Sequence, residues 1–194
     1  AGKAITTSHF NVIIGDDAGK SMTAGAGRSV IIGTYAGDAI TTANYNVAMG
    51  YHALSANYVG SNNTAIGGVA GMSLLGPENT IIGATAGDAL TTSSGSVVIG
   101  YGALTTATTD KYGVAIGYKA MYATSAGLAL ENTIAIGAQA MYGSDATTGG
   151  ISGNVAIGAD AAYYVTTGGN SVYVGYHTGR NVTVGSANTM VGRH

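Results

Sequence analysis

Acidic side chains are the first candidates for chemistry in this sequence, because two carboxyl groups facing each other across a cleft can cleave a glycosidic bond. The chain has nine acids: Asp16, Asp17, Asp38, Glu78, Asp88, Asp110, Glu131, Asp145 and Asp160. Most of them stand alone among turn-forming residues. Asp38 and Asp88 share the local sequence Ala-Gly-Asp-Ala but lie 50 residues apart. We therefore interpret the acids as solvated turn residues and predict no catalytic residue.

Histidine is the next candidate, as a metal ligand, and the chain has four histidines and no cysteine. His52 and His177 both stand two residues after a glycine, at a place where similar segments carry Asp17, Tyr35 and Lys119. If copies of the chain met on an axis, one histidine from each could form a metal-binding ring. The polar residues at this place predict instead that it is exposed. Without a close histidine pair or a Ser/His/Asp constellation, the sequence predicts no metal, no cofactor and no enzyme.

Tyrosine is the most promising residue type for recognition, since its ring and hydroxyl suit contact with glycans or proteins. The chain has 13 tyrosines. The candidates for surface contact are Tyr51, Tyr101, Tyr118, Tyr122, Tyr142 and Tyr176. The alternative interpretation is that these rings only cap the edges of the fold.

Threonine pairs recur at 41–42, 91–92, 108–109 and 166–167. A regular threonine array on a flat β-face can bind ice, so this function stays open as a less favoured alternative. The array is patchy, because the same places hold Tyr58-Val59 and Leu75-Gly76 in other segments.

One repeat that runs from end to end carries all of these residues. Its fixed point is a glycine that recurs every 16 to 21 residues, with 17 the commonest spacing. These repeat glycines are Gly15, Gly33, Gly50, Gly67, Gly83, Gly100, Gly117, Gly137, Gly158 and Gly175, followed by Gly192. Nine of them have alanine three residues later. Because glycine alone takes positive φ without penalty, we predict a tight turn at each repeat glycine.

The residues before each glycine predict a short strand, as in Ser96-Val97-Val98-Ile99. Val97 and Ile99 share one face of such a strand and Val98 lies on the other. Both faces are apolar, so both must be covered. One strand per repeat, stacked on its copies, predicts an all-β parallel solenoid of about ten to eleven turns of 17 residues.

We assign the column directly before the glycines to the core of the coil. Its members are Ile14, Ile32, Ile66, Ile82, Ile99, Ile116, Ile136, Ile157 and Val174. The intervening column, which includes Val98, Ala115 and Ala156, is then predicted to face another chain. The alternative is that it packs against the other half of the same turn, where Ile40 and Leu74 fall seven residues after the glycine. Protruding loops are expected in the long repeats between Gly117 and Gly158.

The amino-acid composition argues against two classes of binding partner, nucleic acids and membranes. Charged residues are only 8% of the chain and the net charge is -2, so the sequence predicts no nucleic-acid partner. No apolar run approaches the ~20 residues of a membrane span, so it also predicts no membrane insertion. Residues 1–194 read as a single array. Because the array lacks atypical capping repeats, we expect it to be a piece of a longer protein.

Three segments carry a family resemblance: Asn-Val-Ala-Ile-Gly at 154–158, Asn-Thr-Ala-Ile-Gly at 63–67 and Gly-Val-Ala-Ile-Gly-Tyr-Lys-Ala-Met at 113–121. They resemble the repeats of tailed-phage fibre proteins and of the head domains of trimeric autotransporter adhesins. The resemblance covers nearly the whole chain. It implies a left-handed β-roll assembled as a homotrimer; the handedness and the number three come from the resemblance alone.

The same resemblance implies a place and a role. Both groups are extracellular, on a virion or a bacterial surface, and contact a host-surface glycan or protein. The repeat of this chain is longer than is usual in adhesin heads, which favours the phage-fibre pattern. We therefore expect a structural and adhesive fibre segment, with the adhesin head as the alternative.

Overall fold

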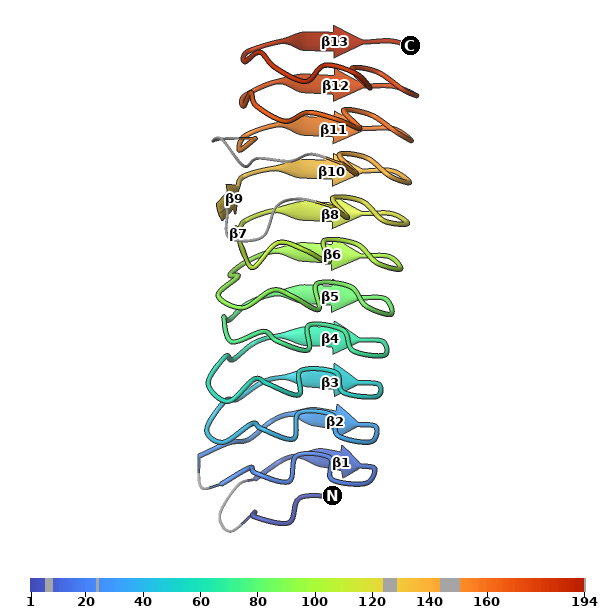
Figure 1. The fold of residues 1–194 in the computed structure, drawn as a ribbon. Coiled ribbons are helices and arrows are strands. Elements are labelled where there is room, and N and C mark those ends of the chain that lie inside the picture. Colours follow the sequence, from blue (N-terminus) through green and yellow to red (C-terminus); the bar gives the residue numbers. More distant parts are fainter. Residues whose placement is uncertain (6–8, 24, 124–128, 144–150, 194) are drawn as a thin grey trace.

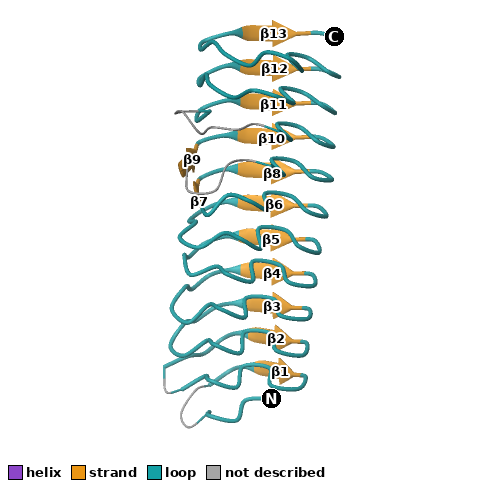
Figure 2. Cartoon of the chain, viewed as in Figure 1, coloured by secondary structure: helices purple, strands orange, loops and turns teal. Residues whose placement is uncertain are grey.

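The chain consists of short strands separated by turns (Figure 2). The computed structural model describes residues 1–5, 9–23, 25–123, 129–143 and 151–193. These residues form no helix, and therefore none that could cross a membrane. The strands are β1 (Val12–Ile14), β2 (Val30–Ile32), β3 (Val47–Met49), β4 (Thr64–Ile66), β5 (Thr80–Ile82), β6 (Val97–Ile99), β7 (Thr109–Lys111), β8 (Val114–Ile116), β9 (Ala129–Glu131), β10 (Ile134–Ile136), β11 (Val155–Ile157), β12 (Val172–Val174) and β13 (Thr189–Val191).

A parallel sheet of 11 strands runs the length of the molecule, in the order β1-β2-β3-β4-β5-β6-β8-β10-β11-β12-β13. Pairing joins equivalent residues of successive repeats, as Val30 pairs with Val47 and Val97 with Val114. The chain coils once between these strands, and the coils are stacked in a column (Figure 1). The predicted parallel β-solenoid is confirmed. We call each coil a rung and name it after its strand in this sheet.

Two further strands were not predicted. β7 and β9 pair in parallel and form a separate sheet of 2 strands at the corner that precedes β8 and β10 (Figure 1). In this small sheet Asp110 is the partner of Leu130, and Lys111 is the partner of Glu131. The connections for which we predicted protruding loops include residues 124–128 and 144–150, which lie outside the described residues.

The two faces of the main strands are the reverse of the prediction. The middle residue of each central strand points into the coil, and Ala48, Val98 and Ala115 are buried. The first and third residues lie outside the coil and are partly or well exposed. The residues assigned to the core therefore lie outside it, and that prediction was wrong; they are Ile14, Ile32, Ile66, Ile82, Ile99, Ile116, Ile136, Ile157 and Val174.

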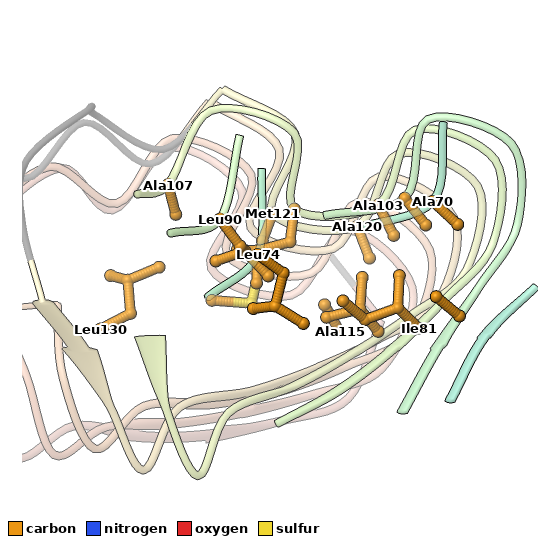
Figure 3. Close-up of a cluster of buried hydrophobic side chains, with 14 of the residues drawn as sticks. Ala70, Leu74, Ile81, Leu90, Ala103, Ala107, Ala115, Ala120, Met121 and Leu130 are labelled. Atoms are coloured by element: carbon orange, nitrogen blue, oxygen red, sulfur yellow. The ribbon is translucent and has the colours of Figure 1, made fainter. Parts of the chain in front are cut away.

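The physical reason is that the second half of each rung carries apolar residues of its own. Ile40, Leu74 and Leu90 are fully buried. They share one core with the middle residues of the strands, such as Ile81 and Ala115, which point toward them (Figure 3). The alternative, in which a turn covers its intervening column by itself, is thus confirmed.

Side-chain volume is balanced within most rungs. Where the middle strand residue is isoleucine or tyrosine, the residue four places after the repeat glycine is glycine, and in three of the five rungs with alanine in the strand that residue is large. The pairs are Ile31 with Gly37, Ile81 with Gly87 and Tyr173 with Gly179, against Ala48 with Leu54, Ala115 with Met121 and Ala135 with Met141. A Cβ added to Gly87 would lie 3.3 Å from the Cδ1 atom of Ile81. The two positions therefore share one space inside the rung.

Tyr173 is the largest side chain in this core, and its hydroxyl is buried without a hydrogen-bond partner among the described residues. Such an unpaired hydroxyl costs roughly 1 to 3 kcal/mol. We expect Tyr173→Phe to raise the free energy of unfolding by about 1 kcal/mol, as measured by urea denaturation. Tyr176→Phe, at an exposed ring, should change nothing. A less stable Tyr173→Phe variant would show that the hydroxyl has a stabilising partner.

A ladder of polar side chains ties the rungs together at the corner before the strands. The ladder position lies directly before each main strand and holds Asn11, Ser29, Asn46, Asn63, Asn79, Ser96, Gly113, Thr133, Asn154, Ser171 and Asn188. The Oδ1 atom of Asn46 accepts a hydrogen bond from the backbone N–H of Asn63 at 2.9 Å. The side-chain amide of Asn46 donates to the carbonyl of Gly60, also at 2.9 Å. Each buried amide is thereby satisfied and joins its rung to the next.

Left-handed backbone conformations recur more often than the sequence predicted. The repeat glycines from Gly15 to Gly175 have φ between 128 and 138°, as the predicted turn requires. In addition, non-glycine residues with φ of 49 to 65° fall at three fixed places of the repeat. These places lie two and four residues after the repeat glycine and five residues before it, as at Tyr35, Leu54 and Asn62. Each rung thus turns through several left-handed residues rather than at one glycine.

Candidate contact surfaces

The outer sheet face is the first candidate surface. It consists of the first and third residues of the main strands: Val12, Ile14, Val30, Ile32, Val47, Met49, Thr64, Ile66, Thr80, Ile82, Val97, Ile99, Val114, Ile116, Ile134, Ile136, Val155, Ile157, Val172, Val174, Thr189 and Val191. None of these residues is charged, and Thr64, Thr80 and Thr189 are the polar ones. The parallel register aligns them in two straight columns. The outer sheet face is therefore an apolar ribbon that extends along the whole sheet.

The tyrosine corner, formed by Tyr51, Tyr101, Tyr118 and Tyr176, is the second candidate surface. Each of these residues directly follows a repeat glycine, and each ring is about half exposed. The rings of Tyr101 and Tyr118 lie in adjacent rungs and stack with their centroids 5.9 Å apart. The predicted contact tyrosines of this group therefore lie at the surface.

The other two predicted tyrosines lie in a tighter arrangement, which we call the tyrosine stack. Tyr122, Tyr142 and Tyr163 each stand five residues after a repeat glycine, and their centroids are 5.2 and 5.0 Å apart. The planes are inclined by only 10 and 21°, so the ring faces cover one another. Burial raises the pKa of the Tyr163 phenol. The stack can therefore offer ring edges and hydroxyls, but not open faces, to a ligand.

Cations lie at both ends of the tyrosine stack. The Nζ atom of Lys119 is 4.6 Å from the ring centroid of Tyr122 and 5.4 Å from that of Tyr118. The guanidinium carbon of Arg180 is 5.0 Å from the centroid of Tyr163. These distances fit cation–π contacts. Arg180 was missed from the sequence, although it stands five residues after its repeat glycine, like the three tyrosines.

Several acids are engaged by cations. Lys20 lies 3.1 Å from a carboxylate oxygen of Asp38 and 3.6 Å from one of Asp17. Lys3 also pairs with Asp17, and this hydrogen bond holds the pKa of the Asp17 carboxyl below its usual value. These contacts form an exposed charge network. They differ from a glycosidase site, in which two carboxyl groups face one substrate.

The predicted histidines lie beside aromatic rings. His52 stacks on Tyr35 with the centroids 4.9 Å apart, and His177 lies 3.1 Å from the carboxylate of Asp160. Among the residues that the structure describes, no group of three histidines, cysteines or acids could hold a metal ion. No family model, curated protein or solved structure matches the chain. Function must therefore be inferred from the two surfaces themselves.

Threonines of these pairs form hydrogen bonds between rungs. Thr41 donates its hydroxyl hydrogen to the carbonyl of Tyr58 at 2.9 Å, and Thr91 does the same toward Thr108 at 2.8 Å. Each bond reaches the next rung, as the ladder bonds do. Because the hydroxyl hydrogen of the first threonine in these pairs already has an acceptor, this pattern favours a structural role over ice binding.

One acid differs from the solvated turn residues that we predicted. Asp110, in the middle of β7, is completely buried. The sequence contained a signal for this, because the equivalent residues of other rungs are the small or apolar Ala43, Gly60 and Leu130. The interpretation of the acids as solvated is therefore wrong for Asp110.

Proposed function

We propose that this chain is a structural and adhesive segment of an extracellular homotrimeric fibre, of the tailed-phage type, that contacts a host cell surface. The observation that carries the proposal is the outer sheet face, which is apolar, free of charge and continuous over all 11 strands. A surface of this kind is typical of contacts between proteins. The number three, the left-handed coil and the host surface come from the family resemblance.

The dimensions of the outer sheet face suit a partner with the same repeat. Strands about 4.8 Å apart and alternate residues about 7 Å apart give a ribbon roughly 48 Å long and 10 Å wide, or about 500 Å². This lies near the upper limit for apolar patches on monomeric proteins, about 600 Å². A second copy presents columns with the same spacing along the same length, so equivalent rungs can pack against each other around a common axis.

The tyrosine corner is the proposed site of host contact. It lies beyond the repeat glycines, on a turn that leaves the sheet. The half-exposed rings of Tyr101 and Tyr118, with Lys119 beside them, provide aromatic, hydrogen-bonding and cationic groups in adjacent rungs. Tyrosine is enriched at contacts between proteins relative to the rest of the surface.

The proposal predicts that Ile99→Asp separates the copies without unfolding the coil. In the parent protein, light scattering coupled to size exclusion should give three times the mass of one chain. The aspartate of Ile99→Asp would be buried without a partner in each of three copies, which costs several kcal/mol per site. We expect the mass of one chain with an unchanged circular dichroism spectrum, because Ile99 lies outside the core of the single rung.

A matched variant separates assembly from host contact. Tyr101→Ala combined with Tyr118→Ala changes exposed rings on the neighbouring turn and should keep the trimer mass, while lowering retention on host cells at least tenfold. A parent protein with the mass of one chain, or an Ile99→Asp variant that remains trimeric, would remove the basis of the proposal.

A further inference from the structure

Asp110 replaces a missing member of the polar ladder. In the rung of β8 the ladder position is Gly113, which has no side chain to join its neighbours. The carboxyl group of Asp110, three residues earlier, fills this space. A Cβ added to Gly113 would lie only 2.7 Å from the Cγ atom of Asp110. The side chain therefore enters the ladder from the preceding turn, in the one rung of the described array where the ladder residue is glycine.

Asp110 is an imperfect replacement for a ladder asparagine, because an ionised carboxylate can only accept hydrogen bonds. The ladder asparagines both accept and donate, as Asn63 does toward Asn79 and the carbonyl of Gly76. Neither carboxyl oxygen of Asp110 has a hydrogen-bond partner of good geometry among the described residues. A protonated carboxyl would regain one donor and resemble an asparagine amide.

Few charges surround this carboxyl. On its own strand Lys111 is exposed, and on β9 Glu131 is exposed. Tyr112, the next titratable group on the chain, is also exposed. β6 and β8 contribute no charged residue. Burial raises the pKa of the Asp110 carboxyl to about 6, an effect that the nearby Ser96 hydroxyl and Lys111 amide partly offset.

We propose that Asp110 is a proton-operated latch for the middle of the array. In its neutral form the carboxyl completes the ladder and holds β7, β8 and β9 together. In its ionised form it is a buried charge that the Ser96 hydroxyl and the Lys111 amide stabilise only in part, and this part of the array opens more often. The latch lies at the small sheet of β7 and β9. Acidification should therefore tighten the pairing of these two strands.

The direction of the effect follows from linkage. An acid whose pKa is raised in the folded state binds its proton more tightly there than in the open state, so protonation stabilises the closed rung. This stabilisation is complete below the ordinary value of 3.8, falls as the pH rises toward about 6 and is absent above it. A difference of about two pKa units corresponds to a change of roughly 100-fold in the opening equilibrium.

Amide hydrogen exchange of the full chain tests the latch. Opening of residues 109–114 and 130–134, corrected for intrinsic exchange rates, should be 10- to 100-fold more frequent at pH 8 than at pH 4. In Asp110→Asn, which keeps the shape and supplies a permanent donor, opening should be low and equal at both pH values. Asp88→Asn, at a half-buried acid of another rung whose pKa burial also raises, should retain the pH dependence of the parent.

A second variant keeps the test decisive even if Asp110→Asn does not fold. Asp110→Ser reproduces Ser93, the equivalent residue of the preceding rung, whose hydroxyl donates to Asn79 at 3.1 Å. It should also remove the pH dependence. Equal opening of the parent at both pH values, or a pH dependence that persists in both variants, would overturn the latch.

Discussion

Gly67→Ala is expected to unfold the rung of β4 and to lower the free energy of unfolding by at least about 3 kcal/mol. The φ angle of Gly67 is 137°, a conformation that residues with a side chain rarely adopt. A Cβ at this position would lie 2.5 Å from the carbonyl oxygen of Gly83 in the next rung. The backbone cannot easily retreat, because the N–H of Gly67 donates to Met49 and that of Gly83 donates to Ile66, both at 2.8 Å.

The adjacent glycine provides a matched control. A Cβ at Gly68 would meet nothing within 4 Å, and its φ is not positive. The equivalent position carries Tyr51, Tyr101 or Tyr118 in other rungs. Gly68→Ala should therefore unfold at the parent urea concentration when both variants are followed by circular dichroism. Equal midpoints for the two variants would contradict the close approach of the rungs at Gly67.

The contrast between Gly67 and Gly68 shows which structural features can be predicted from the sequence repeat. Strand positions, their parallel order and the turn at each repeat glycine could be predicted because the same residue types return at a fixed spacing. Gly67 belongs to that periodic set and Gly68 does not. Periodicity also placed Tyr51, Tyr101, Tyr118 and Tyr176 on one corner, where the structure has them exposed.

The choice between the two strand faces could not be made from the same periodicity, because both faces are apolar. Val97 and Ile99 are larger than Ala115 and Ala156, and burying larger apolar side chains contributes more to stability. The structure shows that alanine can stand inside the coil, as at Ala115, because the second half of the rung supplies a large side chain such as Met121. The inverse relation between the middle strand residue and the residue four places after the repeat glycine, as in Ala115 and Met121, was the available signal.

Other features depend on contacts between rungs, so they cannot be predicted from the sequence of a single repeat. The ring faces of Tyr142 are covered because Tyr122 and Tyr163 stand at the same place in the preceding and following rungs. The burial of Asp110 depends on the absence of a side chain at Gly113. Both features become visible when the residues of successive repeats are compared column by column, including the positions where one repeat departs from the others.

Ala115→Arg is expected to destroy the rung of β8 rather than to separate intact chains. Ala115 is 1% exposed and points toward the second half of its own rung (Figure 3). The side chain of Met121 already fills that space. Arginine would add both excess volume, which costs roughly 1 to 3 kcal/mol, and a buried charge without a partner, which costs several kcal/mol more. We expect a loss of β-structure by circular dichroism, or a midpoint of urea denaturation far below that of the parent.

The next residue of the same strand provides the decisive comparison. Ile116 lies on the outer sheet face, so Ile116→Arg should keep the β-structure of the parent while reducing the mass to that of one chain. The two substitutions introduce the same side chain at neighbouring positions, and they differ only in the face of β8 that receives it. The reverse outcome, with a folded monomer for Ala115→Arg and an unfolded chain for Ile116→Arg, would mean that the coil is closed around the isoleucine column and that the alanine column lies between chains.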